Sequence, residues 1–262
     1  MTKHQAGLLI SLLLILLTAN NVLSQVNEET TQVNKETTGD LLTIDKLLIQ
    51  GETQQAWQVL EEIPEGDLAP DDRLWIMARV QYEMGRGTDK KPLAFFKKAE
   101  EYARAATKEN AGNAEGYKWL AISLGAQAKY SDTKAQVRIS KRVKENIEKA
   151  IAIDPDDDIS YLILSRWHYK NSALGGIARG FAKVLYGGLP KASLDEAEKL
   201  LLQAIKLHDR IAHRYNLAKI YKRMEKMAAA KAQLELALLL PITFPEETKE
   251  KRKAGEKLQE WQ

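Results

Sequence analysis

Hydrophobic side chains recur with a helical period along most of the chain from residue 40 onward, and no stretch alternates convincingly as a strand does. The segment 41–50, for example, places Ile44 and Leu48 on one face and ends at Gly51. The same period returns in the segments that follow, and Pro or Gly residues separate several of them. This pattern predicts an all-α protein made of consecutive helices.

Four of the predicted helices share an internal repeat, in which a bulky apolar residue is followed by a small one. The four pairs are Met77-Ala78, Leu120-Ala121, Leu164-Ser165 and Leu217-Ala218. Each is followed by a second helix with alanine at regular positions, and a small residue where two helices cross lets their backbones approach closely. The spacing resembles the tetratricopeptide repeat, a helix–turn–helix of about 34 residues.

We therefore expect a tetratricopeptide-like α-solenoid, because one helix pair cannot bury its apolar face alone and several must stack. About five helix pairs fit the sequence, with insertions in the third and fourth pairs and a polar C-terminal capping helix within 246–262. The pairs fall roughly at 41–64, 72–108, 114–154, 158–208 and 212–241.

The first 24 residues have the order of a secretory signal: Lys3 and His4, an apolar run over 8–17, and small residues before Gln25. We expect cleavage there, then a flexible polar leader at 25–39 and the repeat domain at 40–262. The alternative is an uncleaved segment that anchors the protein in a membrane. Given this signal, we expect an exported protein. Because the chain has no cysteine and so does not need an oxidising compartment, a bacterial periplasm fits best.

The composition of the chain excludes several kinds of binding and catalytic site. The 262 residues carry a formal net charge of only +3, so a nucleic-acid binder is not indicated. Without cysteine, the chain has no disulfides and no thiol nucleophile. His208 and His213 are five residues apart and do not share the helical face that a zinc pair needs. We find no catalytic constellation and expect a protein that is not an enzyme, with no cofactor and no metal.

The insertions in the third and fourth helix pairs give a more specific resemblance to a known family than the repeat does. The segments 125–137 and 171–193 lie inside the third and fourth pairs, and the stretch IARGFAKVLYGGLPKASLDEAE (177–198) is the most distinctive. Together with AISLG (121–125) and NLAKIYKRM (216–224), it resembles the regulator of microtubule dynamics family, over roughly residues 74–245.

The resemblance implies a tetratricopeptide-like, non-enzymatic binding scaffold. Some members of that family associate with microtubules, mitochondria or the endoplasmic reticulum. Given the predicted signal, we expect an exported bacterial relative, and for such a protein we expect no tubulin partner.

The first helices of a solenoid line its concave face, and here they carry bases and tyrosines. The row of candidate binding residues is Trp75, Arg79, Tyr82, Lys118, Ile122, Leu162, Arg166, Tyr169, Tyr215, Lys219 and Lys222. Arginine can hold a carboxylate with two hydrogen bonds, and tyrosine adds contact area at low entropic cost. We therefore predict that this groove binds a protein partner through an extended, acidic segment; an ordinary solvated face is the alternative.

The insertion at 172–190 suggests a second function. Its Ile177, Phe181, Val184 and Leu185 have the spacing of one helical stripe, with bases elsewhere on the turn and glycines around it. Such an element could enter a lipid interface or cover an apolar ligand. The alternative is that the stripe packs into the solenoid.

Overall fold

The computed structural model describes residues 37–173, 188, 190–243, 245 and 247–261. Within these ranges the chain forms consecutive helices and no β-strand. A helical segment at 37–50 comes first. The labelled helices are α2 (Thr53–Glu62), α3 (Pro70–Arg86), α4 (Pro92–Glu109), α5 (Ala114–Gln127), the 3₁₀ helix η1 (Ala128–Tyr130), α6 (Thr133–Ile153), α7 (Asp158–Ser172), α9 (Leu194–Leu207), α10 (Ile211–Arg223), α11 (Met227–Leu239) and α12 (Glu247–Glu260).

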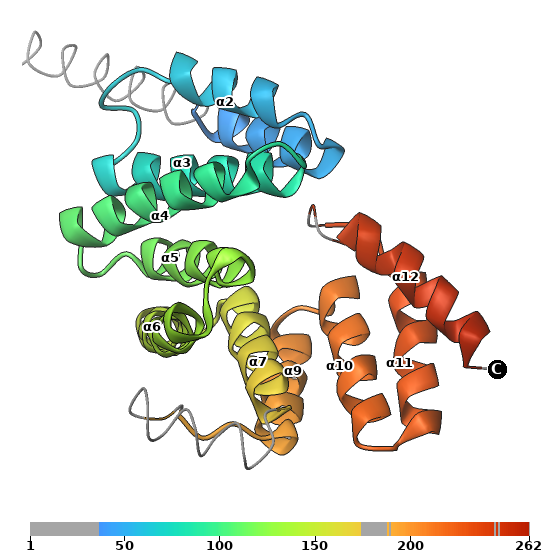
Figure 1. Ribbon diagram of the computed structural model, residues 1–262. Helices are drawn as coiled ribbons and strands as arrows, with labels where there is room; N and C mark the ends of the chain where they lie inside the picture. Colours follow the sequence, from blue (N-terminus) through green and yellow to red (C-terminus); the bar gives the residue numbers. More distant parts are fainter. Residues whose placement is uncertain (1–36, 174–187, 189, 244, 246, 262) are drawn as a thin grey trace, which may run out of the picture.

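The predicted pairing is confirmed. Each first helix packs against the helix that follows it, so α3 pairs with α4, α5 with α6, α7 with α9 and α10 with α11. The pairs follow one another around an open arc, and α12 turns back from the end of α11 to lie beside α10 (Figure 1). Among the described residues, no helix combines the length and the apolar character that crossing a membrane requires.

The small residues of the repeat lie where the sequence places them, at helix crossings. Ala78, Ala121, Ser165 and Ala218 are each at most 1% exposed. Ser165 satisfies its hydroxyl by donating to the carbonyl of Ala197, at 2.8 Å, so a polar small residue is tolerated at a crossing. Close packing at these positions explains the repeat physically, since a larger side chain would separate the helices.

Polar contacts at the N-terminal ends of the first helices join successive pairs. Asn113, the N-cap of α5, donates to Asp71 in the first turn of α3, at 2.7 Å. Lys118 of α5 contacts Asp157, the N-cap of α7, at 3.1 Å. Arg210 before α10 holds Asp158 at the start of α7. Three consecutive junctions are therefore linked along the same edge of the solenoid.

The C-terminal helix is attached by buried carboxylates, although its composition predicts an exposed cap. Glu247 is fully buried and accepts hydrogen bonds from the backbone N–H of Ala212, at 3.0 Å, and of Thr243, at 2.8 Å. Trp261, just after α12, is 8% exposed, and the Nζ of Lys222 lies 4.3 Å from its ring centroid. The helix is thus a structural part of the last pair.

Candidate functional site

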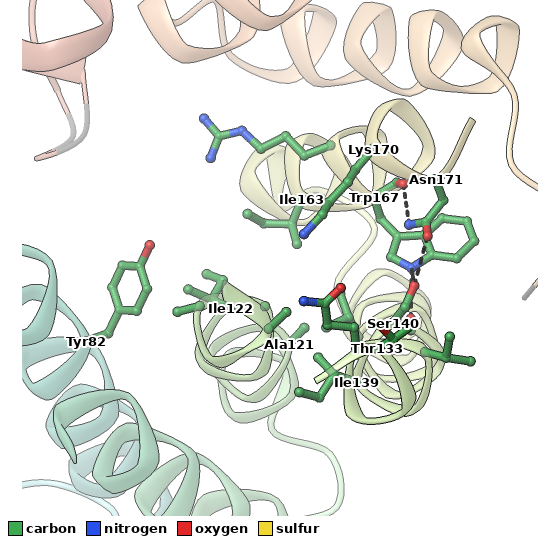
Figure 2. Close-up of a pocket in the computed structure, with 17 residues that line it drawn as sticks. Tyr82, Ala121, Ile122, Thr133, Ile139, Ser140, Ile163, Trp167, Lys170 and Asn171 are labelled. Carbon is green, nitrogen blue, oxygen red and sulfur yellow. Dashed lines mark hydrogen bonds between the residues drawn. The ribbon is translucent and has the colours of Figure 1, made fainter. Parts of the chain in front are cut away.

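An apolar cavity of about 530 Å³ lies between α3, α5, α6 and α7. Its walls are mostly aliphatic and include Ile122, Val137, Val143 and Ile163. Figure 2 shows Tyr82 on one side and the side chains of α5, α6 and α7 on the other. We call this space the apolar cavity.

Three polar side chains in the wall of the apolar cavity, those of Ser140, Trp167 and Asn171, form hydrogen bonds with one another and with their backbone carbonyls. The indole Nε1–H of Trp167 donates to the carbonyl of Ser140, at 2.8 Å. The Ser140 hydroxyl donates to Asn171 Oδ1, at 3.1 Å, and Asn171 Nδ2 donates to the Trp167 carbonyl, at 2.8 Å (Figure 2). Because these groups already have partners, this wall presents mainly apolar surface to a ligand.

A second cavity, of about 820 Å³, lies between α7, α10 and α12. Its lining combines tyrosines with bases and a single carboxylate, that of Glu250. We call it the cationic cavity, after the six bases in its wall: Arg166, Lys170, Lys219, Arg223, Lys249 and Lys253.

Glu250 ties α12 to the two helices opposite. Its Oε1 accepts a hydrogen bond from Arg166 Nη2, at 2.8 Å, and one from Asn216 Nδ2, at 3.1 Å. Burial raises the pKa of the Tyr215 hydroxyl beside it, and the charge of Glu250 adds to that rise. Tyr215 therefore stays neutral at physiological pH and offers a neutral hydroxyl inside a charged site.

The two cavities share Arg166 and Lys170 in their linings. They therefore adjoin at these two side chains, and we refer to the two cavities together as the groove, with an apolar end and a cationic end. Such an arrangement can hold a ligand whose apolar and anionic parts lie side by side.

The structure brings several of the predicted groove residues together. Tyr82 and Ile122 line the apolar cavity, Arg166 lines both cavities, and Tyr169, Tyr215 and Lys219 line the cationic one. Six residues of the predicted row thus line one cavity or the other.

The other predicted residues lie outside both cavities because they have partners within the fold. Trp75 donates from Nε1 to Asp72, at 2.9 Å. Arg79 forms an ion pair with Asp45, and its guanidinium lies 5.9 Å from the ring centroid of Trp119.

Lys118 is buried, although its position in the repeat predicts that it faces the groove. It is only 7% exposed and forms ion pairs with Glu115 and Asp157. Leu162 is likewise buried in the core. Lys222 is exposed, and its ammonium lies over the ring of Trp261 and 4.0 Å from Glu260. The predicted stripe of Ile177, Phe181, Val184 and Leu185 lies outside the described residues.

Four bases of the cationic cavity lie outside the predicted row: Lys170, Arg223, Lys249 and Lys253. A usable signal was present, since 166/170, 219/223 and 249/253 are each separated by four residues and so share a helical face. What the sequence lacks is the return of α12 to α7, which brings the third pair to the other two.

A polar cluster around Asp158 lies at the junction of α7 and α10. Arg210 contacts both carboxylate oxygens, with Nη2 3.2 Å from Oδ1, and His213 Nε2 lies 3.2 Å from Oδ2. His213 Nδ1 donates to the carbonyl of His208, at 2.8 Å. His208 Nδ1 lies 3.3 Å from Asp158 Oδ1, so the two histidines, separated by five residues, meet at one carboxylate. Within the described ranges no three His, Asp or Glu side chains form a group that could hold a metal ion.

A model of one protein family, "Regulator of microtubule dynamics protein 1-3", matches residues 40–262, which is most of the chain. The chain belongs to this family. The family match therefore confirms the resemblance drawn from the two insertions and extends it from 74–245 to the whole repeat domain.

Two curated relatives carry the same family name. Regulator of microtubule dynamics protein 3 of Xenopus laevis is 32% identical over 207 residues, which cover 76% of this chain and 45% of that protein. Regulator of microtubule dynamics protein 1 of Bos taurus is 31% identical over 156 residues, covering 58% and 49% respectively. The chain thus spans about half the length of these relatives. Both are eukaryotic, and neither supports the prediction of an exported bacterial protein.

Among solved structures, a thermophilic tetratricopeptide-repeat protein of Thermus thermophilus superposes with a TM-score of 0.62 at 19% sequence identity. The match covers 85% of this chain and 98% of that protein. At this identity the likeness shows the fold alone, and the fold is that of a tetratricopeptide-like solenoid.

Proposed function

We propose that this protein is a non-enzymatic interaction scaffold whose groove binds an amphipathic segment of a partner protein. Apolar side chains of the segment enter the apolar cavity, and acidic side chains of the same segment face the cationic cavity. The family match and the fold support a protein-interaction role in general. The groove and the acidic character of the partner are our proposal.

One observation carries this proposal: the apolar and cationic cavities adjoin at Arg166 and Lys170. A ligand that used only one chemistry would leave half of the groove unfilled. A short extended chain can present apolar and acidic side chains a few residues apart, which suits a groove that changes character along its length.

The affinity expected for such a segment is modest. Burying two or three aliphatic side chains contributes about 1.5–3 kcal/mol each, and ordering a flexible segment on association costs several kcal/mol or more. We therefore expect micromolar binding, weakened by salt because part of it is electrostatic.

Peptide display against the purified protein tests the proposal. Peptides selected for binding are measured against Ala126→Trp, which fills the apolar cavity from α5, and Lys170→Glu, which reverses one of the two shared residues. Ala228→Trp on the exposed part of α11 and Lys206→Glu on α9 are matched controls outside the groove.

We expect the selected peptides to be rich in apolar and acidic residues. Ala126→Trp and Lys170→Glu should each weaken their binding at least tenfold, and the two controls should not. Undiminished binding to both groove variants would refute this function.

The second candidate is a lipid-binding or apolar-ligand module that uses the insertion 172–190. Its stripe lies outside the described residues, so it stays a prediction from the spacing of Ile177, Phe181, Val184 and Leu185. Phe181→Asp should abolish vesicle binding while leaving the protein folded; unfolding would instead indicate a packed stripe.

The location of the protein also stays a proposal. The order of residues 1–24 supports export with cleavage before Gln25. N-terminal sequencing of the protein from its native host would test it: a start at Gln25 is expected, and an intact residue 1 would favour a membrane anchor.

A further inference from the structure

The cationic cavity holds more positive charge than its own carboxylate can neutralise. Glu250 is engaged by Arg166 and Asn216. Among the described residues, no carboxylate lies within ion-pair distance of the four bases that complete the wall: Lys170, Arg223, Lys249 and Lys253. An excess of this size inside a concave site attracts an anion from outside the fold.

Two of the bases at the cavity, Lys219 and Arg223, are held in place before any ligand arrives. The Lys219 ammonium lies 5.2 Å from the ring centroid of Tyr169, and the Arg223 guanidinium lies 5.2 Å from the same ring. Arg223 also donates from Nη1 to the carbonyl of Tyr169, at 2.7 Å. Stacking on a ring orients a cation without removing its charge. The cavity is therefore pre-organised for an anion.

The C-terminal helix completes this site. Lys249 and Lys253 are one helical turn apart on α12, next to Glu250, and Glu250 fixes the helix against α7 and α10. Three helices that are distant in sequence thus each contribute a pair of bases to one cavity. A helix whose role was only to cover the last pair would not need its lysines here.

We propose that the cationic cavity binds a phosphate monoester dianion, carried as phosphoserine or phosphothreonine on the partner segment. This inference rests on the proposed function. A carboxylate brings one negative charge, whereas a phosphate monoester brings close to two charges and three strong acceptor oxygens. Several lysines and arginines around one open cavity suit a tetrahedral group that accepts bonds from many directions.

The position of the bases favours a peptide over a membrane as the source of the phosphate. They line a concave space between α7, α10 and α12 and do not form a flat face. A phosphate in a bilayer lies in a broad plane of headgroups and would have to leave that plane to reach them. A phosphorylated side chain on an extended segment can enter while its apolar neighbours fill the adjoining apolar cavity.

The test uses a fluorescent peptide series and the purified protein. Each peptide carries three leucines, and one serine follows them at a spacing that varies from two to eight residues. The serine is either free or phosphorylated. Binding is measured by fluorescence anisotropy in low salt, between pH 5 and pH 8.

We expect phosphorylation at one or two of the spacings to tighten binding at least tenfold at pH 7.5. The gain should shrink below about pH 6, where the dianion takes up a proton. Lys249→Gln with Lys253→Gln should remove the gain but retain binding of the unphosphorylated peptide. Lys90→Gln with Lys206→Gln, two exposed lysines outside the cavity, should keep it.

Each contrary outcome is distinct. Equal binding with and without phosphate at every spacing would overturn this inference and leave the proposed function standing. Failure of every peptide, phosphorylated or not, would count against the proposed function as well. Binding of phosphatidate vesicles that depends on Lys249 and Lys253, without any phosphopeptide effect, would overturn the peptide as the source.

Discussion

Replacing Asp158 by Asn should uncouple the last helix pair from the rest of the solenoid. Asparagine keeps the shape of the side chain but removes its charge, so that Arg210 and His213 lose the carboxylate they share. His213 is fully buried and the Arg210 side chain is 22% exposed. Breaking a buried ion pair costs about 3–5 kcal/mol. Because water reaches part of Arg210, we expect about 3 kcal/mol.

The pH dependence gives this prediction a second test. Burial alone would raise the pKa of the Asp158 carboxyl, but the hydrogen bonds and charges of His213 and Arg210 outweigh it and hold the pKa well below its usual range. In the unfolded chain the pKa is about 3.9. The stabilisation is therefore complete above about pH 4 and is lost as the pH falls toward the folded-state pKa. The variant should lack that contribution.

Urea and thermal unfolding followed by circular dichroism measure the effect. For a domain of this size, about 3 kcal/mol corresponds to a fall in Tm of about 6–12 °C. Hydrogen exchange should show faster opening in α10, α11 and α12 than in α3 to α6, since neighbouring repeats are coupled only through their interfaces. Asp156→Asn, at an exposed neighbouring position, is the control. A variant Asp158→Asn within about 0.5 kcal/mol of the parent would refute the reasoning.

Four further predictions concern packing and protonation. Gly85→Ala should destabilise by about 1–3 kcal/mol in urea unfolding, because its Cβ would lie 2.8 Å from Phe96 Cε1. Gly125→Ala, whose Cβ meets nothing within 4 Å, should stabilise by about 0.5–1 kcal/mol; equal effects would contradict both values. Burial lowers the pKa of His168, so its neutral form stabilises the fold above about pH 6.5 and that contribution is lost as the pH falls below it. His168→Gln should therefore flatten the stability profile between pH 7 and 5, and an unchanged slope would argue against it. Trp261→Ala should loosen α12 by about 3 kcal/mol, seen as faster hydrogen exchange there and not in α5.

The repeat could be predicted from the sequence because its signal is local. Ala78, Ala121 and Ala218 each follow a bulky residue in a helical period, and close packing leaves few alternatives to a small side chain at a crossing. The same logic does not fix which way a polar side chain points. Lys118 has the spacing of a groove residue, but its side chain forms an ion pair with Asp157 of the next pair and so lies at the junction of α5 and α7.

For a related reason, only part of the cationic cavity could be predicted from the sequence. Arg166 and Lys219 lie on first helices and could be placed on the concave face by repeat position. Glu250 lies in a polar tail that indicates exposure, and its partners are 84 and 34 residues away. A charge is buried only when a partner compensates it, and a partner at that distance leaves no local pattern.

The linked edge described for the N-terminal ends of the first helices has a mechanical consequence. Because Asp71–Asn113, Lys118–Asp157 and Asp158–Arg210 join the pairs on that side, rotation of neighbouring pairs about an axis along it disturbs these contacts least. Displacement then grows toward the opposite ends of the first helices. Lys170 and Arg223 lie at those far ends, in the last turns of α7 and α10. The hydrogen bond from Arg223 to the Tyr169 carbonyl joins these two far ends. A rotation that broke this bond would therefore change the separation of the bases in the cationic cavity while the N-terminal edge keeps its spacing.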